Sequence, residues 1–308
     1  PNRAINPRRR GPITHIQLAE TCRLLGEPER ACVHAQKAIT NRPDLPQGYI
    51  NLGMALQEQN DLDQAIEAYG RALEIDSGQV QARINRALAA LTLEQFEPGW
   101  ADYEARVNSG LIENTDLRFS WPVWKGEPLK NTKVLVLMEQ GIGDEIFFAG
   151  MIPNLIKDAE QCVVECTDRN LPLFRRSFPK ATVVSRTEPP DPACTEGRFD
   201  YQLLAGSLGR AYRNCSNSFA GSQAYLVADA EKKQACLDRY RTLGKGLKVG
   251  ISWCSGNTLE GRRRTISLEQ WEPVLTVPGI QFINLQYGDC GEAIKQAKDQ
   301  LGVVIYQD

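Results

Sequence analysis

Hydrophobic and small residues recur every 34 positions through the first third of the chain. In such a pattern the small residues lie where two helices of a hairpin touch, and the large ones fill the space between hairpins. The spacing predicts a first domain at 1–113 made of three helical hairpins, at about 12–45, 46–79 and 80–113. The middle copy is the most regular, with Tyr49, Leu52, Gly53, Leu56, Ala65, Tyr69, Ala72 and Ile75.

The periodicity resembles the tetratricopeptide repeat, over roughly residues 12–113. The third copy departs from the pattern, because Arg83, Arg86 and Arg106 stand at positions that are apolar in the repeat. Such arrays have a concave surface that binds proteins or peptides.

Two interpretations of the array stay open. It either binds a protein or peptide, or it is a short helical cap that packs against the next domain, since three copies are near the minimum for stability. Under the first interpretation the candidate contact residues are Tyr49, Asn51 and Asn85.

After a linker at 114–131, short apolar runs alternate with helical patterns. The runs at 134–138, 162–166, 182–185 and 201–204 are typical of strands buried on both faces, and an amphipathic helix is expected at 146–156. This alternation predicts a doubly wound parallel sheet, a Rossmann-like domain at 132–228.

A linker helix is expected within 229–246, followed by a second parallel-sheet domain at 247–308. Its strands are predicted at 247–253, 281–285 and 303–306, with helices at 267–275 and 292–300. Ser267 and Gln270 have the spacing of a capping box. Because a doubly wound domain usually has five or six strands, we expect this second domain to be incomplete.

Composition narrows the chemistry. The net charge of the 308 residues is only -2, which gives no argument for a nucleic-acid partner, and no apolar run is long enough to span a bilayer. Nine scattered cysteines without a C-x-x-C pair indicate reduced thiols and a cytoplasmic protein. The only histidines, His15 and His34, lie in the repeats, so a general base in the second half is expected to be a carboxylate.

The first candidate site follows the strand at 134–138. It is a glycine loop that ends in a carboxylate, Glu139-Gln140-Gly141-Ile142-Gly143-Asp144. Ligands of parallel sheets bind beyond the carboxyl ends of the strands, so Asp144 is either a cap of the following helix or a base that removes a proton from an acceptor hydroxyl. A dinucleotide site is the competing interpretation, with Glu165 about twenty residues further on, but Ile146 stands where the third glycine of that fingerprint belongs.

The second candidate site is the loop after the strand at 247–253. Glycine, small polar residues and three arginines gather there, which favours a pyrophosphate cradle over a solvated basic loop. The candidate residues are Ser252, Ser255, Gly256, Asn257, Arg262, Arg263, Arg264 and Gln286.

Three strings together resemble bacterial tetratricopeptide-repeat glycosyltransferases, a family similar to the lipopolysaccharide heptosyltransferases: residues 139–145, 250–257 and 284–289. The resemblance implies a GT-B-like pair of Rossmann-type domains and a metal-independent, inverting transfer without a cofactor. It also implies that Gly143-Asp144 supplies the catalytic base and that a basic residue among Arg262–Arg264 binds the donor phosphates. The family's C-terminal donor-binding segment has no counterpart here, so the chain is expected to be truncated at its C-terminal end.

The sequence therefore predicts a glycosyltransferase that uses a nucleotide sugar and acts on a hydroxyl acceptor, with a protein recruited by the repeats as one candidate acceptor. The alternative is a non-catalytic repeat scaffold whose transferase-like half has lost its activity.

Overall fold

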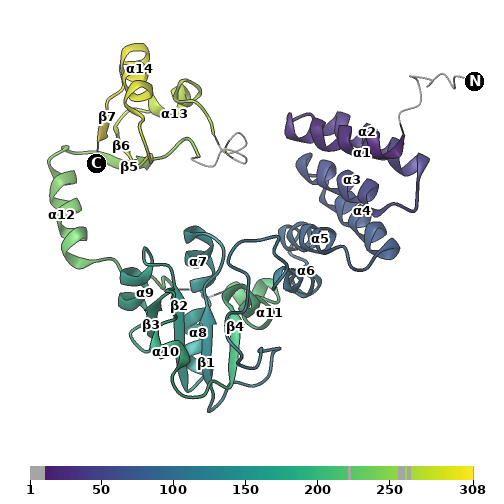
Figure 1. The fold of residues 1–308 in the computed structure, drawn as a ribbon. Helices are drawn as coiled ribbons and strands as arrows, with labels where there is room; N and C mark the ends of the chain where they lie inside the picture. The colour runs from purple at the N-terminus through teal and green to yellow at the C-terminus, as the bar shows by residue number, and fades with distance from the viewer. Residues whose placement is uncertain (1–10, 221–222, 256–260, 262–264, 308) are drawn as a thin grey trace, which may run out of the picture. The chain divides into compact units, whose positions relative to one another are not determined.

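The computed structural model describes residues 11–220, 223–255, 261 and 265–307 (Figure 1). The chain divides into two compact units, Pro1–Val227 and Ala228–Asp308. The described helices include none that is long and apolar enough to cross a membrane.

The first unit begins with three helical hairpins. Proline stands in the first turn of α1, α2 and α3, where its missing N–H leaves no helical hydrogen bond unmade. The helices are α1 (Pro12–Leu24), α2 (Pro28–Asn41), α3 (Pro46–Glu58), α4 (Leu62–Ile75), α5 (Val80–Thr92) and α6 (Phe96–Tyr103), followed by the short 3-10 helix η1 (Glu104–Arg106).

The hairpins pack through glycine and alanine. Tyr69 of α4 is fully buried, and its ring lies against Gly53 of α3, where an added Cβ would be 2.6 Å from a ring carbon. The Tyr69 hydroxyl donates to Gln57 Oε1 at 2.9 Å. The predicted small-against-large packing of the middle repeat is therefore present.

The repeats lead into a parallel sheet of order β3-β2-β1-β4. Its strands are β1 (Lys133–Leu137), β2 (Gln161–Cys166), β3 (Thr182–Ser185) and β4 (Tyr201–Leu204). Val134 and Val136 face one apolar cluster and Leu135 and Leu137 another, so β1 is buried on both faces. The accompanying helices are α7 (Ile142–Ala149), α8 (Ile152–Asp158), α9 (Leu171–Ser177), α10 (Pro192–Thr195), η2 (Ala205–Leu208), α11 (Gly209–Tyr212) and η3 (Ser216–Phe219).

The region that the sequence predicted as one helix forms two helices in the structure. The pattern predicted a continuous helix at 146–156, whereas α7 ends at Ala149 and α8 starts at Ile152. Pro153 lies in the first turn of α8 and has no N–H to donate to the carbonyl of Ala149 in α7, so the helical hydrogen bonds are interrupted between the two helices.

The second unit contains α12 (Ala230–Arg241) and a parallel sheet of order β5-β6-β7. Its elements are β5 (Leu247–Ile251), η5 (Leu268–Trp271), α13 (Glu272–Leu275), β6 (Ile280–Asn284), α14 (Gly291–Leu301) and β7 (Ile305–Gln307). The predicted capping box is wrong: the Ser267 side chain makes no capping hydrogen bond, and a 3-10 turn precedes the short α13.

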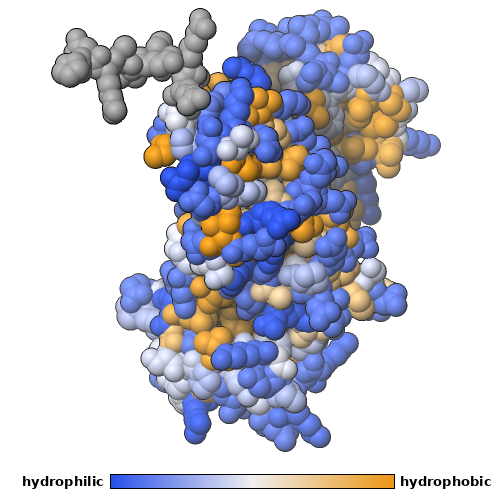
Figure 2. All heavy atoms as spheres, turned by 90° about the vertical axis from the view of Figure 1, so that its right-hand side faces the viewer, coloured by the Kyte–Doolittle hydropathy of each residue, from blue (hydrophilic) through white to orange (hydrophobic). Residues whose placement is uncertain are grey.

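All nine cysteines are free. Burial raises the pKa of the thiols of Cys162, Cys166 and Cys194 to about 12. On the face drawn in Figure 2, apolar residues gather in several separate patches within a largely hydrophilic surface.

Candidate functional site

The glycine loop lies at the carboxyl edge of the first sheet, where β1 passes into α7. Gln140 has a φ of 62°, and Gly141 is the N-cap of α7. Asp144 is exposed in the first turn, and its Oδ2 accepts a hydrogen bond from the Gly141 N–H at 3.1 Å. The carboxylate thus caps the helix while staying open to solvent, so capping does not remove it as a candidate base.

Glu139, at the start of this loop, faces the interior. It forms a two-pronged ion pair with Arg106, with Nε to Oε2 at 2.7 Å and Nη2 to Oε1 at 2.6 Å, and both side chains are 0% exposed. The backbone N–H of Gly206 donates to the same Oε1 at 2.6 Å. Burial alone would lower the pKa of Arg106, but the hydrogen bonds and charge of Glu139 outweigh it and raise that pKa. Arg106 therefore keeps its charge inside the fold.

The ion pair fills the point where the order of the strands reverses. β1 precedes Glu139 and β4 precedes Gly206, and ligands of parallel sheets commonly enter between two such strands. A Cβ on Gly206 would lie 2.8 Å from Arg106 Nη2 and from Glu139 Oε1, so the residue after β4 must be small. A side chain of the last repeat occupies a place that often holds a ligand.

The last repeat and the start of the linker also hold the next residue of the loop. Gln140 Nε2 donates to the Tyr103 hydroxyl at 2.6 Å, and Asn114 Nδ2 donates to the Gln140 carbonyl at 3.2 Å. Burial raises the pKa of Tyr103, so this hydroxyl stays neutral at pH 7. We call Tyr103, Arg106 and Asn114 the loop clamp.

Two further buried carboxylates line the same edge of the sheet. Glu145 accepts from the backbone N–H of Thr167 at 3.1 Å and from Asn170 Nδ2 at 2.7 Å. Glu165, at the end of β2, accepts from Arg118 Nη1 at 2.9 Å, and burial raises its pKa against the opposing charge of Arg118.

The sequence interpretation did not identify these ionic contacts. It treated Arg106 only as a departure from the repeat and Glu165 as a feature of a dinucleotide site. The signal available was a charged residue within or just after a buried strand, as at Glu165 and Glu139, because a buried charge requires a partner.

In the second unit, Gln286 joins the carboxyl ends of β5 and β6. Its Oε1 accepts from Ser252 Oγ at 3.0 Å and from the backbone N–H groups of Trp253 at 3.0 Å and Cys254 at 2.9 Å. Ser255 N–H donates to Thr265 Oγ1 at 3.2 Å. Gln286 thus shapes the start of the predicted phosphate loop, whereas Gly256, Asn257, Arg262, Arg263 and Arg264 lie outside the described residues.

The predicted partner-binding residues lie on α3 and α5 and are half-buried. Asn51 Nδ2 donates to the Ile16 carbonyl at 3.0 Å, and Asn85 Oδ1 accepts from Gln81 at 2.8 Å. Tyr49 packs against the apolar cluster around Tyr69. Their role toward a partner stays a prediction.

Family models for the tetratricopeptide repeat match residues 46–78 and residues 12–37. The first third of the chain is an array of tetratricopeptide repeats. Protein FlbA of Caulobacter vibrioides (strain ATCC 19089 / CIP 103742 / CB 15) is 30% identical over 303 residues, which are 92% of this chain and 50% of that protein. The chain thus spans about half the length of this relative.

Solved structures also resemble the chain. The second TPR of Spaghetti (RPAP3) bound to an HSP90 peptide is 19% identical, with a TM-score of 0.31, and covers 31% of this chain and 89% of its own. The TPR2B domain of yeast Sti1 in its pHsp70 complex is 21% identical, with a TM-score of 0.31, and covers 32% of this chain and 85% of its own. Each overlap is confined to about a third of the chain.

Proposed function

We propose that this chain is part of an inverting, metal-independent glycosyltransferase that moves a sugar from a nucleotide sugar to a hydroxyl acceptor. The observation that carries the proposal is the exposed carboxylate of Asp144, at the start of α7 and at the carboxyl edge of a parallel sheet. The loop clamp supports it, because a base must be held in place to act on a bound hydroxyl.

The proposed step uses one carboxylate. The Asp144 carboxylate takes the acceptor's hydroxyl proton, and the acceptor oxygen forms a bond to the anomeric carbon of the sugar. The bond from that carbon to the nucleoside diphosphate breaks, and its electron pair leaves with the diphosphate. Attack from the face opposite the leaving group inverts the configuration. Gln140, Gly141 and Gly143 would shape the acceptor side of this loop.

The second unit would hold the donor diphosphate. Ser252, Ser255 and Gln286 lie at the carboxyl ends of its strands, and we assign the phosphate contacts to them and to the Gly256, Asn257 and Arg262–Arg264 loop. Guanidinium and N–H groups stabilise the charge that develops on a departing diphosphate. We also propose that the two sheet-containing units form the pair of Rossmann-type domains of a GT-B glycosyltransferase.

The buried Arg106–Glu139 pair argues against a dinucleotide site in the first unit. A pyrophosphate would approach the carboxyl edge between neighbouring strands, where the paired side chains already lie. Arg106 already donates to both carboxylate oxygens of Glu139, so these N–H groups are not available to a pyrophosphate.

The repeats would recruit the acceptor, which we propose to be a protein or peptide, and the chain would work in the cytoplasm, where its nine free thiols stay reduced. One observation favours a second candidate, a repeat scaffold without turnover: the family-model matches lie within the repeats alone.

Release of nucleoside diphosphate from UDP-, GDP-, ADP- and CDP-sugars, with and without a protein acceptor, tests the proposal. We expect one donor to raise the melting temperature and to be turned over, and Asp144→Asn to lower that rate by about a hundredfold or more. Asp63→Asn is the matched control, because Asp63 is also an exposed carboxylate in the first turn of a helix. Equal rates in the two variants, or no shift with any donor, would favour the scaffold.

A further inference from the structure

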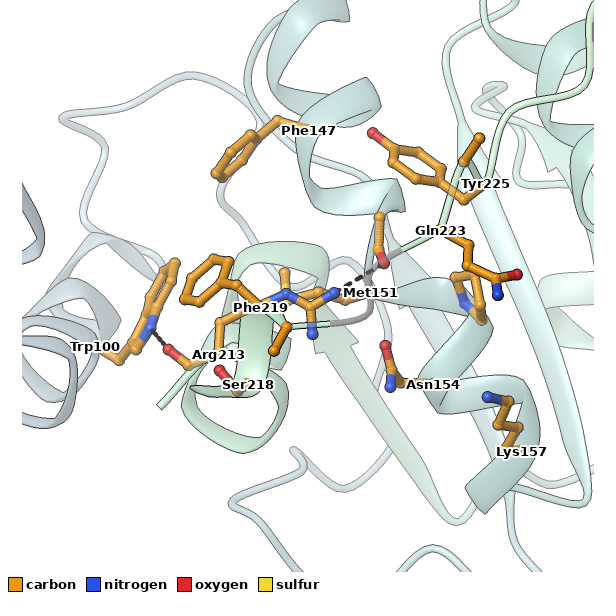
Figure 3. A pocket seen from close by; sticks show the side chains of 14 residues that line it. Trp100, Phe147, Met151, Asn154, Lys157, Arg213, Ser218, Phe219, Gln223 and Tyr225 are labelled. Carbon is orange, nitrogen blue, oxygen red and sulfur yellow. Dashed lines mark hydrogen bonds between the residues drawn. The ribbon is translucent and has the colours of Figure 1, made fainter. Parts of the chain in front are cut away.

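A second site lies within the first unit, and no residue of the loop clamp lines it. It is a cavity of about 590 Å³ where α6 meets α7, α8 and the segment that follows α11 (Figure 3). Small-molecule sites commonly enclose about 300–1,000 Å³. The cavity is thus large enough for an aromatic residue with its neighbours.

One side of the cavity is aromatic. Trp100, Phe147 and Phe219 gather there, and Phe147 and Phe219 are 66% and 42% exposed. Trp100 is fixed by its Nε1–H, which donates to the Arg213 carbonyl at 2.7 Å. Exposed rings beside a hollow indicate a surface for an apolar ligand, because a monomer gains nothing by leaving several of them in water.

The other side is polar and cationic. Asn154 and Lys157 of α8 line it, and Arg213 lies between them and the aromatic rings (Figure 3). Arg213 Nη2 donates to the Gly150 carbonyl at 3.3 Å, and its guanidinium carbon lies 5.5 Å from the centre of the Phe219 ring. Among the described residues, no Asp or Glu lines the cavity and neither cation has an ion-pair partner.

We propose that this cavity binds a carboxylate joined to an apolar group, either the C-terminal residue of a peptide or a small hydrophobic acid. The carboxylate lies against Arg213 and Lys157, and the apolar group stacks among Trp100, Phe147 and Phe219. A charge-assisted hydrogen bond to the partly buried guanidinium provides selectivity for the anion, and the rings provide most of the affinity. The site is independent of the proposed transfer.

Calorimetric titration of the 308-residue chain with N-acetyl-phenylalanine tests the proposal, with N-acetyl-phenylalaninamide as the uncharged probe. We expect the acid to bind and the amide to bind at least about tenfold more weakly, since the amide lacks the charge. Arg213→Gln and Phe219→Ala should each raise the dissociation constant of the acid by about tenfold. Arg213→Lys keeps the positive charge and should retain part of the binding. Comparing it with Arg213→Gln shows whether binding is lost with the charge or because the protein no longer folds.

Matched controls are Arg198→Gln and Leu111→Ala, which change an exposed arginine and an exposed apolar residue outside the cavity. Both should bind like the parent chain, and the melting temperature of each variant checks that it is folded. Tighter binding of N-acetyl-Gly-Gly-Phe than of N-acetyl-phenylalanine would assign the site to peptide C-termini. Equal binding of the two would assign it to small hydrophobic acids. Equal binding of acid and amide, or none up to about 10 mM, would overturn the proposal.

Discussion

At the scale of single residues, Arg106 links two parts of the chain that are distant in sequence. It comes from the end of the last repeat and pairs with Glu139 at the end of β1, and neither side chain is exposed. Its Nη1 also donates to the Tyr103 carbonyl at 3.0 Å. A buried charge that loses its partner keeps its full cost of desolvation, which makes this pair a sensitive point of the fold.

We predict that Arg106→Met lowers the free energy of unfolding by about 3–5 kcal/mol, because Glu139 is left charged and buried without a partner. Arg71→Met is the control, since Arg71 forms an ion pair whose side chains are 58% and 65% exposed, and solvent screening should leave stability nearly unchanged when it is lost. Urea denaturation measures both. Adding Glu139→Leu to Arg106→Met should restore much of the loss, and equal losses in the two single variants would contradict this role.

At the scale of elements, close helix contacts in the repeats depend on glycine. Gly53 of α3 lies under the Tyr69 ring of α4, and the two helices could not keep this distance with a side chain between them. Gly70, one residue after Tyr69, lies on the same helix, but a Cβ added there would lie 3.9 Å from its nearest neighbour, Arg86 Nη1. Helix packing therefore requires glycine at position 53, whereas position 70 is a helix position with room for a side chain.

We predict that Gly53→Ala destabilises the array by about 1–3 kcal/mol, because the added Cβ overlaps a buried ring that cannot move aside. Gly70→Ala should instead stabilise it by up to about 1 kcal/mol, because alanine loses less backbone entropy in a helix. Thermal unfolding of both variants, followed by circular dichroism, measures the two changes in stability. If the two changes had the same sign, the Gly53 contact would not limit how closely the helices pack.

At the scale of the whole molecule, the two sheets differ in how well they are covered. In the first unit, β1 pairs with β2 on one side and β4 on the other, and four of its five residues are buried. In the second unit, β5 pairs with β6, only Ile251 of its five residues is buried, and α12 has no buried residue.

We predict that amide hydrogens of β1 exchange at least about a hundredfold more slowly than those of β5, because few apolar contacts oppose local opening around β5. Hydrogen exchange with peptide-level mass spectrometry measures the difference. Binding of the proposed donor to the second unit should slow exchange at β5 and leave β1 unchanged. Equal protection of β1 and β5 in the free chain would contradict the comparison.

Periodicity alone determined most of the elements. The strands at 182–185 and 201–204 lie where the apolar runs placed them, and the repeats follow their 34-residue spacing, because burial in a strand or helix imposes a local period on the side chains. The missing N–H of Pro153 also explains the break between Ala149 and Ile152, although the hydrophobic pattern by itself ran across it.

The tertiary structure alone decided the ionic contacts. Arg106 and Glu139 are 33 positions apart, and Glu145 and Asn170 are 25 apart, so no local spacing could pair them. The aromatic cavity likewise combines Trp100 from the repeats with Phe147 and Phe219 from the sheet region. Periodicity reports which face of an element is buried, but the partner of a buried charge or an exposed ring depends on where distant elements meet, and only the folded chain fixes that.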